Sequence, residues 1–111
     1  MRELRCGEWS SGPVKVADSF WRRLAGIHGV PRGWGVLIPG RSVHGFSIVA
    51  GLWAVGLDKT LRVVVVRSLR PGGLVVFREA TAVLELRSDR APPHVGWRLS
   101  WKGDVSPWPG S

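Results

Sequence analysis

The chain has 111 residues, which is enough for one hydrophobic core and too few for two. An apolar share of 44% excludes a disordered chain, and a single cysteine, Cys6, excludes an intramolecular disulfide and a cysteine-based zinc site. The net charge of +8 comes from 16 Lys and Arg against 8 Asp and Glu, but no three basic residues are consecutive, so scattered charge alone does not identify a nucleic-acid-binding motif.

The two ends of the chain differ in composition from the middle. Residues 1–12 are polar and contain glycine, which predicts a lead-in segment, and residues 103–111 predict a tail that its prolines keep from continuing a strand. Residues 13–102 hold the patterned sequence of a single domain. No apolar run follows the first basic residues, and the longest apolar stretch is about twelve residues where a membrane-spanning helix needs roughly 20. We therefore expect a soluble, cytoplasmic protein.

The first patterned elements are a short strand at residues 14–17 and the one helix that the sequence predicts. Asp18 or Ser19 can cap this helix, because a short side-chain oxygen accepts hydrogen bonds from the free N–H groups of the first turn. Glycines limit its length to about two and a half turns. Its apolar stripe follows the spacing i, i+4 and i+7: Phe20, Leu24 and Ile27.

From residue 36 onward the pattern predicts strands separated by tight turns, with Asp58 in a turn where its side chain bonds its own backbone. Residues 63–66 are all valine, which is typical of a strand covered on both faces. The expected strands cover 36–38, 42–46, 52–57, 61–69, 74–77, 80–86 and 97–101. The sequence thus predicts a mostly β fold: a compact small barrel or a strongly curled antiparallel or mixed sheet, with one short N-terminal helix.

Several short segments follow one another in a set order along residues 14–102. They are Val16-Ala17-Asp18, Arg22-Arg23-Leu24-Ala25-Gly26-Ile27, Gly35-Val36-Leu37-Ile38, Ser42-Val43-His44-Gly45-Phe46, Val55-Gly56-Leu57-Asp58, Leu69-Arg70-Pro71 and Val83-Leu84-Glu85-Leu86. In this order they resemble the uncharacterised protein family filed as domain of unknown function 192, of which the chain looks like a divergent member. The resemblance implies a mostly β fold with the arginine-bearing helix packed on it, and it implies no reaction. Short relatives are similar to proteins encoded beside pilus and secretion systems, so a link to such systems is one expectation.

The chain departs from the family pattern after the histidine. The family's methionine is replaced by Ile48, and its proline, aliphatic residue and aspartate are replaced by Gly51, Leu52 and Trp53. The missing aspartate removes a polar group from any shared site, and this counts against an enzyme.

Three residues are the candidate ligand-binding set: His44, Arg23 and Trp53. The imidazole of His44, beside a glycine that permits close approach, can bond a ligand or move a proton. The alternative is a structural histidine bonded to a neighbouring carbonyl. Arg23 is expected to pair with Glu85, because a forked guanidinium matches a carboxylate, and this pair is more often architectural than catalytic.

The leading hypothesis is a non-enzymatic small binding or accessory domain with a polar site around His44, whose partner is an unidentified small polar ligand or protein segment. No cofactor and no metal site are predicted, because the three histidines are dispersed. Two alternatives stay open. One is a basic nucleic-acid-binding domain that uses arginines and the loop tryptophans for contact, and the other is a hydrolase-like enzyme that uses His44 as general acid or base. The oligomeric state is open as well.

Overall fold

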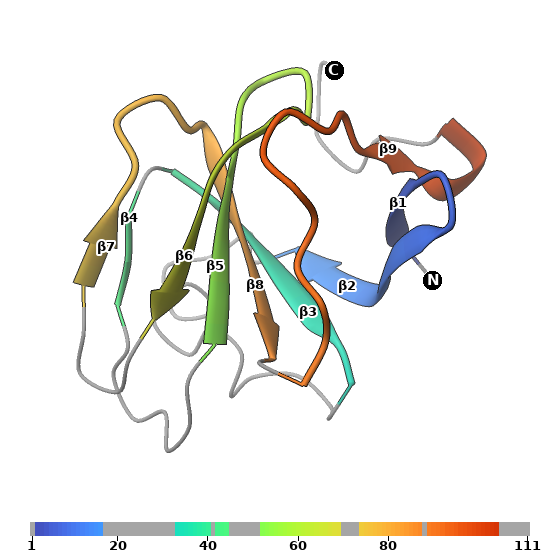
Figure 1. Ribbon diagram of the computed structural model, residues 1–111, viewed down its shortest axis with the longest axis horizontal. Helices are drawn as coiled ribbons and strands as arrows, with labels where there is room; N and C mark the ends of the chain where they lie inside the picture. The colour runs from blue at the N-terminus through green and yellow to red at the C-terminus, as the bar shows by residue number, and fades with distance from the viewer. Residues whose placement is uncertain are drawn as a thin grey trace.

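The structure, a computed structural model, consists almost entirely of β-strands (Figure 1). It describes residues 2–16, 33–40, 42–44, 52–69, 74–87 and 89–104. These ranges contain one short 3-10 helix, η2 (Lys102–Asp104), and no α-helix. The strands are β1 (Glu3–Cys6), β2 (Trp9–Val16), β3 (Gly35–Pro39), β4 (Ser42–His44), β5 (Leu52–Leu57), β6 (Val63–Leu69), β7 (Leu74–Val76), β8 (Ala82–Arg87) and β9 (Ser100–Trp101). The predicted mostly β fold is confirmed, and the predicted helix lies outside the described residues.

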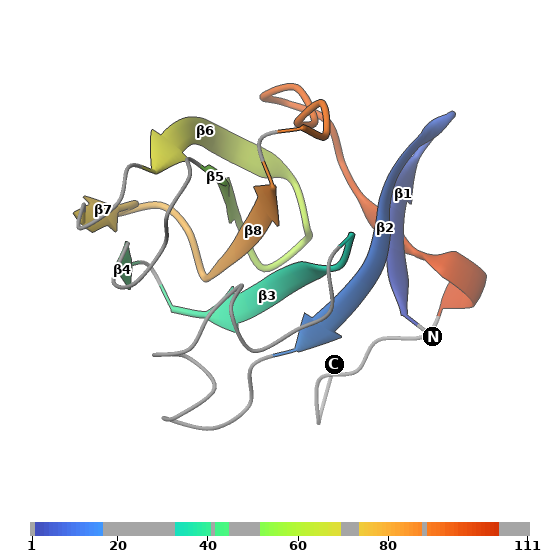
Figure 2. The same cartoon turned by 90° about the horizontal axis from the view of Figure 1, so that it is seen from below.

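Seven strands form one mixed sheet in the order β6-β5-β8-β3-β2-β1-β9. The pair β2–β3 is parallel, and the other neighbours in this sheet are antiparallel. Seen from below, the strands curve around a shared interior as a half-barrel (Figure 2). Strands β4 and β7 pair separately as a two-stranded sheet beside β6 (Figure 1). A strongly curled mixed sheet is therefore what the chain forms.

The segment between β8 and β9 connects the two edges of the curled sheet. Gly96 donates from its N–H to the carbonyl of Val63 at 2.8 Å, and the N–H of Val63 donates to the carbonyl of Trp97 at 2.7 Å. The chain then continues into β9, where Trp101 is the register partner of Leu4 in β1. Because an exposed strand edge invites pairing with other chains, this crossing segment protects part of both edges.

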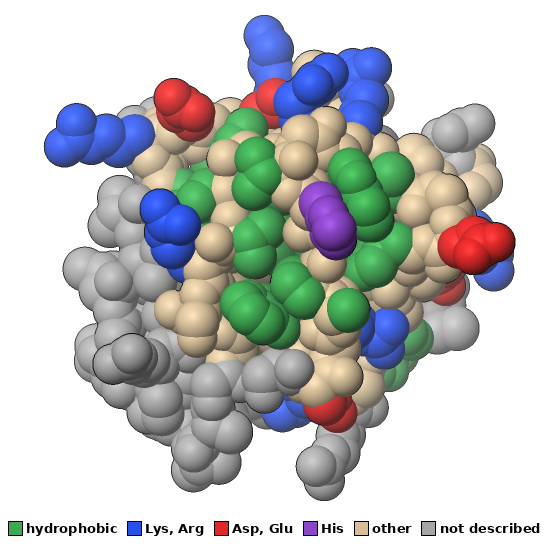
Figure 3. All heavy atoms as spheres, in the orientation of Figure 1, with side chains coloured by type: hydrophobic (Ala, Val, Ile, Leu, Met, Phe, Trp, Pro, Cys, Tyr) green, Lys and Arg blue, Asp and Glu red, His purple; other side chains and the backbone are tan. Residues whose placement is uncertain are grey.

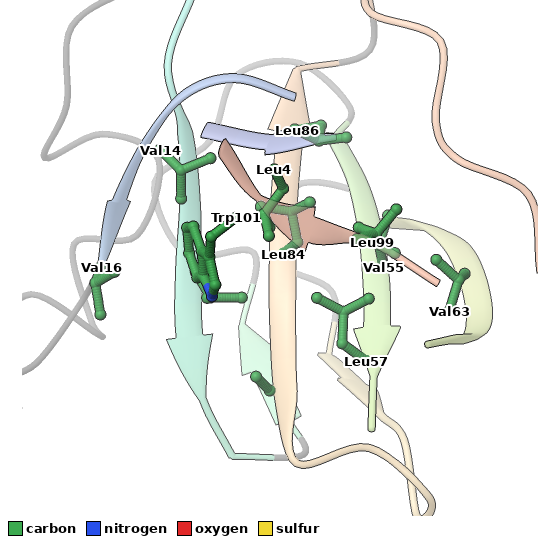
Figure 4. Close-up of a cluster of buried hydrophobic side chains, with 12 residues drawn as sticks. Leu4, Val14, Val16, Val55, Leu57, Val63, Leu84, Leu86, Leu99 and Trp101 are labelled. Atoms are coloured by element: carbon green, nitrogen blue, oxygen red, sulfur yellow. The ribbon is translucent and has the colours of Figure 1, made fainter. Parts of the chain in front are cut away.

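The inner face of the half-barrel holds the larger core. Leu84 of β8 is 0% exposed, and the cluster of side chains to which it belongs comes from all seven strands of the sheet and from the crossing segment (Figure 4). This cluster consists of Leu4, Val14, Val16, Leu37, Val55, Leu57, Val63, Ala82, Leu84, Leu86, Leu99 and Trp101. Burying such side chains contributes roughly 1.5–3 kcal/mol each, so this face supplies most of the driving force for folding.

The outer face of the same sheet is buried as well. Its cluster consists of Val36, Ile38, Leu52, Ala54, Phe77, Ala80 and Val83. Gly56 belongs to this face, and a Cβ atom there would lie 2.8 Å from both Phe77 and Val65, so the close packing requires glycine. The sequences of β5 and β8 are therefore nearly continuous apolar runs, as expected for strands covered on both faces. The valine run of β6 follows the same rule, with Val63 and Val66 on the inner side and Val64 and Val65 on the outer side.

The segment expected to be a lead-in is part of the sheet, which corrects the prediction that strands begin at residue 14. Strand β1 and the start of β2 form a hairpin in which Cys6 pairs with Trp9, and Leu4 is 0% exposed. The hydroxyl of Ser11 is buried between the two strands and accepts from the N–H of Leu4 at 2.9 Å. Polar side chains in this stretch form hydrogen bonds with backbone groups inside the sheet. A segment of low apolar content can therefore still be an ordered part of the fold.

Candidate functional site

Trp53 and Glu85 lie on opposite faces of the sheet. Trp53 is the register partner of Leu86 and packs against the inner cluster. Glu85 is the partner of Ala54 in β5 and belongs to the outer face, because successive residues of a strand point to opposite sides. Side chains on opposite faces of the sheet are separated by it and cannot contribute to the same ligand site.

Of the other two predicted site residues, the structure describes only the backbone of His44. His44 ends β4, where its backbone pairs with that of Leu74. Arg23 and the side chain of His44 lie outside the described residues. A polar site formed by these two residues, and the pairing of Arg23 with Glu85, therefore stay predictions.

Glu85 stands at the middle of a row that crosses five strands. Its neighbours in the row are Ala54 and Val36, which are 0% and 1% exposed, and the ends of the row are the exposed Arg67 and Lys15. With a strand spacing of about 4.8 Å, the Cα atom of each of these cations lies about 10 Å from that of Glu85. Glu85 itself is 2% exposed, and no side chain in the described ranges forms a salt bridge with it.

Burial raises the pKa of Glu85 from 4.5 to about 7, because removal from water disfavours the charged carboxylate. A carboxyl group that titrates near neutral pH is a signal of function when it faces a cleft. The cavity that the described residues line contains its chain neighbours Leu86 and Arg87 but not Glu85. Glu85 is therefore a buried acid of the outer face that does not line this cavity.

That cavity, with a volume of about 210 Å³, opens beside the end of β8. It is lined by Gly33, Trp34, Leu86, Arg87, Asp89 and Arg90. The guanidinium of Arg90 donates to the carbonyl of Ser10 at 3.2 Å and to that of Gly33 at 3.4 Å. It also fills the space beside Gly12, where a Cβ atom would lie 2.7 Å from Nη2. Arg90 therefore braces β2 against the start of β3, and its guanidinium is already bonded to two backbone carbonyls.

A stronger candidate lies at the end of the barrel where β5 turns into β6. Asp58 organises this turn with one carboxylate oxygen, which accepts from the N–H of Thr60 at 2.8 Å, the hydroxyl of Thr60 at 2.7 Å and the N–H of Arg62 at 3.0 Å. The hydroxyl of Thr60 is the largest cause that holds the pKa of Asp58 below its ordinary value, and the two backbone N–H groups and the charge of Arg62 act in the same direction. The predicted bonding of Asp58 to its own turn is confirmed.

Three exposed cations surround this turn. Arg62 and Arg98 are register partners across an isolated antiparallel bridge, so the two positively charged side chains leave the backbone at directly opposite positions. Lys59 lies in the same turn, and Nε of Arg98 donates to the carbonyl of Thr60 at 3.3 Å. None of the three forms a salt bridge with an acid in the part of the chain that the structure describes. Like charges in opposed positions destabilise a strand pair, and here the nearby charge of Asp58 offsets part of the repulsion, since the charge of Arg62 lowers the pKa of Asp58.

An aromatic pair lies in the segment directly before Arg98. The rings of His94 and Trp97 stack with their centroids 4.5 Å apart and an angle of 4° between their planes. Figure 3 shows a histidine side chain standing among hydrophobic side chains on this face, with Lys and Arg side chains gathered above, over the β5–β6 turn of Figure 1. Val95, in the same loop, is 61% exposed. We call the surface formed by Lys59, Arg62, His94, Trp97 and Arg98 the basic aromatic end.

Sequence reasoning did not identify the basic aromatic end. Arg98 and Thr60 are 38 residues apart in the chain, so no local pattern brings their neighbours together. The spacing of His94 and Trp97 does carry a local signal, because a turn with glycine at its third position brings the first and fourth residues close. This turn forms, with the N–H of Trp97 donating to the carbonyl of His94 at 3.1 Å and Gly96 at a φ of 95°.

In the described ranges, no three side chains of histidine, cysteine, aspartate or glutamate lie close enough together to hold a metal ion. No helix in those ranges is long and apolar enough to cross a membrane. Comparison with protein-family models, with curated proteins and with solved structures finds no match to this chain. The candidate site therefore rests on its own geometry and charge, and the resemblance to domain of unknown function 192 stays a prediction.

Proposed function

We propose that this protein is a non-enzymatic binding domain and that its basic aromatic end holds an anionic partner. The observation that carries the proposal is the pairing of Arg62 with Arg98, two exposed arginines opposite each other across a strand bridge. Lys59 adds a third cation at the same turn. A bound anion would offset the repulsion between these like charges by Coulomb attraction to both.

The acid nearest to these cations does not neutralise them by direct contact. One carboxylate oxygen of Asp58 accepts hydrogen bonds from the backbone and from the hydroxyl of its own turn. At this end of the half-barrel, three cations therefore stand beside one anion. The chain as a whole carries a net charge of +8, which favours the approach of an anion from a distance. These two features support a polyanion rather than a neutral ligand.

Inorganic polyphosphate is a suitable probe, because it carries only repeated anionic charge. We expect it to bind the purified protein at low salt, and we expect log Kobs to fall against log salt with a slope of about −2 for three phosphate contacts. The test variant removes the three cations at the basic aromatic end: Lys59→Gln, Arg62→Gln and Arg98→Gln. The matched control removes three other exposed cations: Arg2→Gln, Lys15→Gln and Arg67→Gln.

The test variant is expected to lose the salt-dependent binding, while the control variant keeps most of it. An equal loss of polyphosphate binding in both variants would show that the binding depends on the net charge of the protein and not on this surface. Absence of binding by the unchanged protein at low salt would also overturn the proposal. Thermal unfolding of each variant checks that the fold is intact.

A further inference from the structure

We infer that the partner of the basic aromatic end is single-stranded nucleic acid, with a base stacked on the imidazole of His94. This inference rests on the proposed function and names the chemical class of its ligand. The cations account for attraction to phosphate, whereas the stacked ring pair adds a flat surface that a simple polyanion would not use. Phosphate contacts and aromatic stacking together are the two features that proteins use for single strands.

The aromatic platform is held in place by backbone bonds before any ligand arrives. The N–H of Trp97 donates to the carbonyl of His94 at 3.1 Å, and the carbonyl of Trp97 accepts from Val63 at 2.7 Å. The indole is half-buried against the inner cluster, whereas His94 is exposed. One face of the imidazole therefore rests on a fixed indole, and a base that stacks on the other face needs little further ordering of the protein.

The aromatic platform and the nearest arginine follow each other directly along the chain. Arg98 is the next residue after Trp97, so their Cα atoms are about 3.8 Å apart. Arg62 lies opposite Arg98 on the neighbouring segment, and Lys59 lies in the adjoining turn. We infer that the phosphates beside a base on His94 are bound by these flexible side chains, whose donors suit phosphate oxygens.

The same geometry favours a single strand over a duplex and over an acidic protein segment. Bases in a duplex are already stacked and expose only their edges, so the flat face of His94 would gain nothing from them. An acidic peptide would pair with the arginines and leave the ring pair and the 61% exposed Val95 unused. Stacking depends on the face that all bases share, so we expect little sequence preference.

The experiment measures fluorescence anisotropy of a labelled oligothymidylate of about ten nucleotides, in the range that single-strand-binding domains cover. An abasic strand of the same length and charge is the matched ligand, because it keeps the phosphates and lacks the bases. Stacking contributes about 1–3 kcal/mol per base, so we expect the unchanged protein to bind the thymidine strand roughly tenfold more tightly than the abasic strand.

His94→Ala is the decisive variant, because the exposed ring can be removed without opening the core. We expect it to bind the two strands with equal affinity, because the ring on which a base would stack is gone. Val95→Ala, which alters the neighbouring exposed side chain, should keep the tenfold difference. Trp97→Leu is a second test of the platform, with thermal unfolding to check the fold, since Trp97 packs against the inner cluster.

The outcomes separate this inference from the proposed function. Equal binding of both strands by the unchanged protein, with polyphosphate bound, would overturn the stacking inference and leave the anionic site in place. Tighter binding of a duplex or of a polyglutamate peptide than of the thymidine strand would overturn it as well. Failure to bind any of these anions would overturn the proposed function itself.

Discussion

The centre of the sheet and the β5–β6 turn each contain an acid with a shifted pKa, and the two shifts have opposite directions. Glu85, flanked by Ala54 and Val36, has a pKa raised to about 7 by desolvation. Asp58 has a lowered pKa, because its carboxylate accepts hydrogen bonds from Thr60 and Arg62. Both are carboxylic acids of similar intrinsic strength, so the surroundings alone account for the difference.

This comparison shows how the fold separates two kinds of region. In the sheet centre, neighbours supply apolar surface and no described donor, so the neutral form of Glu85 is favoured. At the turn, backbone N–H groups and a hydroxyl are arranged around one oxygen, so the charge of Asp58 is stabilised inside the turn. Asp58 thus shapes the turn that carries the cations for which we propose an anionic partner.

The largest expected effect comes from removing the charge at the sheet centre with Glu85→Gln. The folded state holds the proton of Glu85 more tightly than the unfolded state, so the stability from this group is complete below pH 4.5 and falls as the pH rises to about 7. A raised pKa of this size corresponds to about 3 kcal/mol. Urea unfolding between pH 4.5 and 8 should show the variant gaining stability over the unchanged protein by up to that amount at the upper end.

Glu79→Gln is the control for that series, because Glu79 is an exposed acid in the turn before β8. Its difference from the unchanged protein should stay within about 0.5 kcal/mol across the same range. Parallel pH curves for Glu85→Gln and the unchanged protein would contradict the desolvation of Glu85.

A smaller effect is expected at the turn from Asp58→Ala, which removes the acceptor of three hydrogen bonds. The loss at pH 7 should be about 1–2 kcal/mol in the free energy of unfolding. Because the pKa of Asp58 is lowered in the folded state, its contribution is present above 3.8 and is lost as the pH falls through the folded value. Urea unfolding should therefore show the variant and the unchanged protein converging in strong acid, whereas a constant difference would exclude a role for the charge.

The smallest effect is expected from Thr60→Val, which keeps the shape of the side chain and removes the hydroxyl that donates to Asp58 at 2.7 Å. The pKa of Asp58 should move up toward 3.8, because its largest stabilising contact is lost. Carbon NMR of the Asp58 carboxyl group measures this directly, and the loss of stability should stay below about 1 kcal/mol. Thr60→Ser keeps a hydroxyl and should keep the lowered pKa; an equal shift in both variants would assign the effect to packing.

Much of the strand pattern could be predicted from local sequence. The predicted strand at residues 52–57 is β5 as observed, and the others from residue 36 to residue 86 match β3, β4, β6, β7 and β8 within three residues at each end. These strands are bounded by turn residues and filled with β-branched side chains, which are local properties. The hairpin of β1 and β2 was missed, because its polar residues are satisfied by the partner strand and by Arg90, more than 70 residues away along the chain.

The candidate site was the less predictable part. Trp53 was predicted to lie near His44 and Arg23 in a ligand-binding set, which stays a prediction; the register with Leu86 places Trp53 on the inner face of the sheet. Arg98 was not among the predicted site residues, and its partner Arg62 comes from a different hairpin. Which side chains meet across a sheet depends on strand order, and strand order is not encoded in the pattern of any single strand.

The sequence by itself determined the mostly β composition of this protein, the turn held by Asp58 and the alternation that separates Trp97, Leu99 and Trp101 from Arg98 and Ser100. These features depend on residues a few positions apart, whose interactions are available to the chain before it folds. The tertiary structure decided that the outer face is buried around Glu85, that the crossing segment joins both edges of the sheet, and that two arginines meet at one end of the barrel. Those outcomes depend on contacts between distant segments, which arise only when burial of both faces selects one strand order and one register.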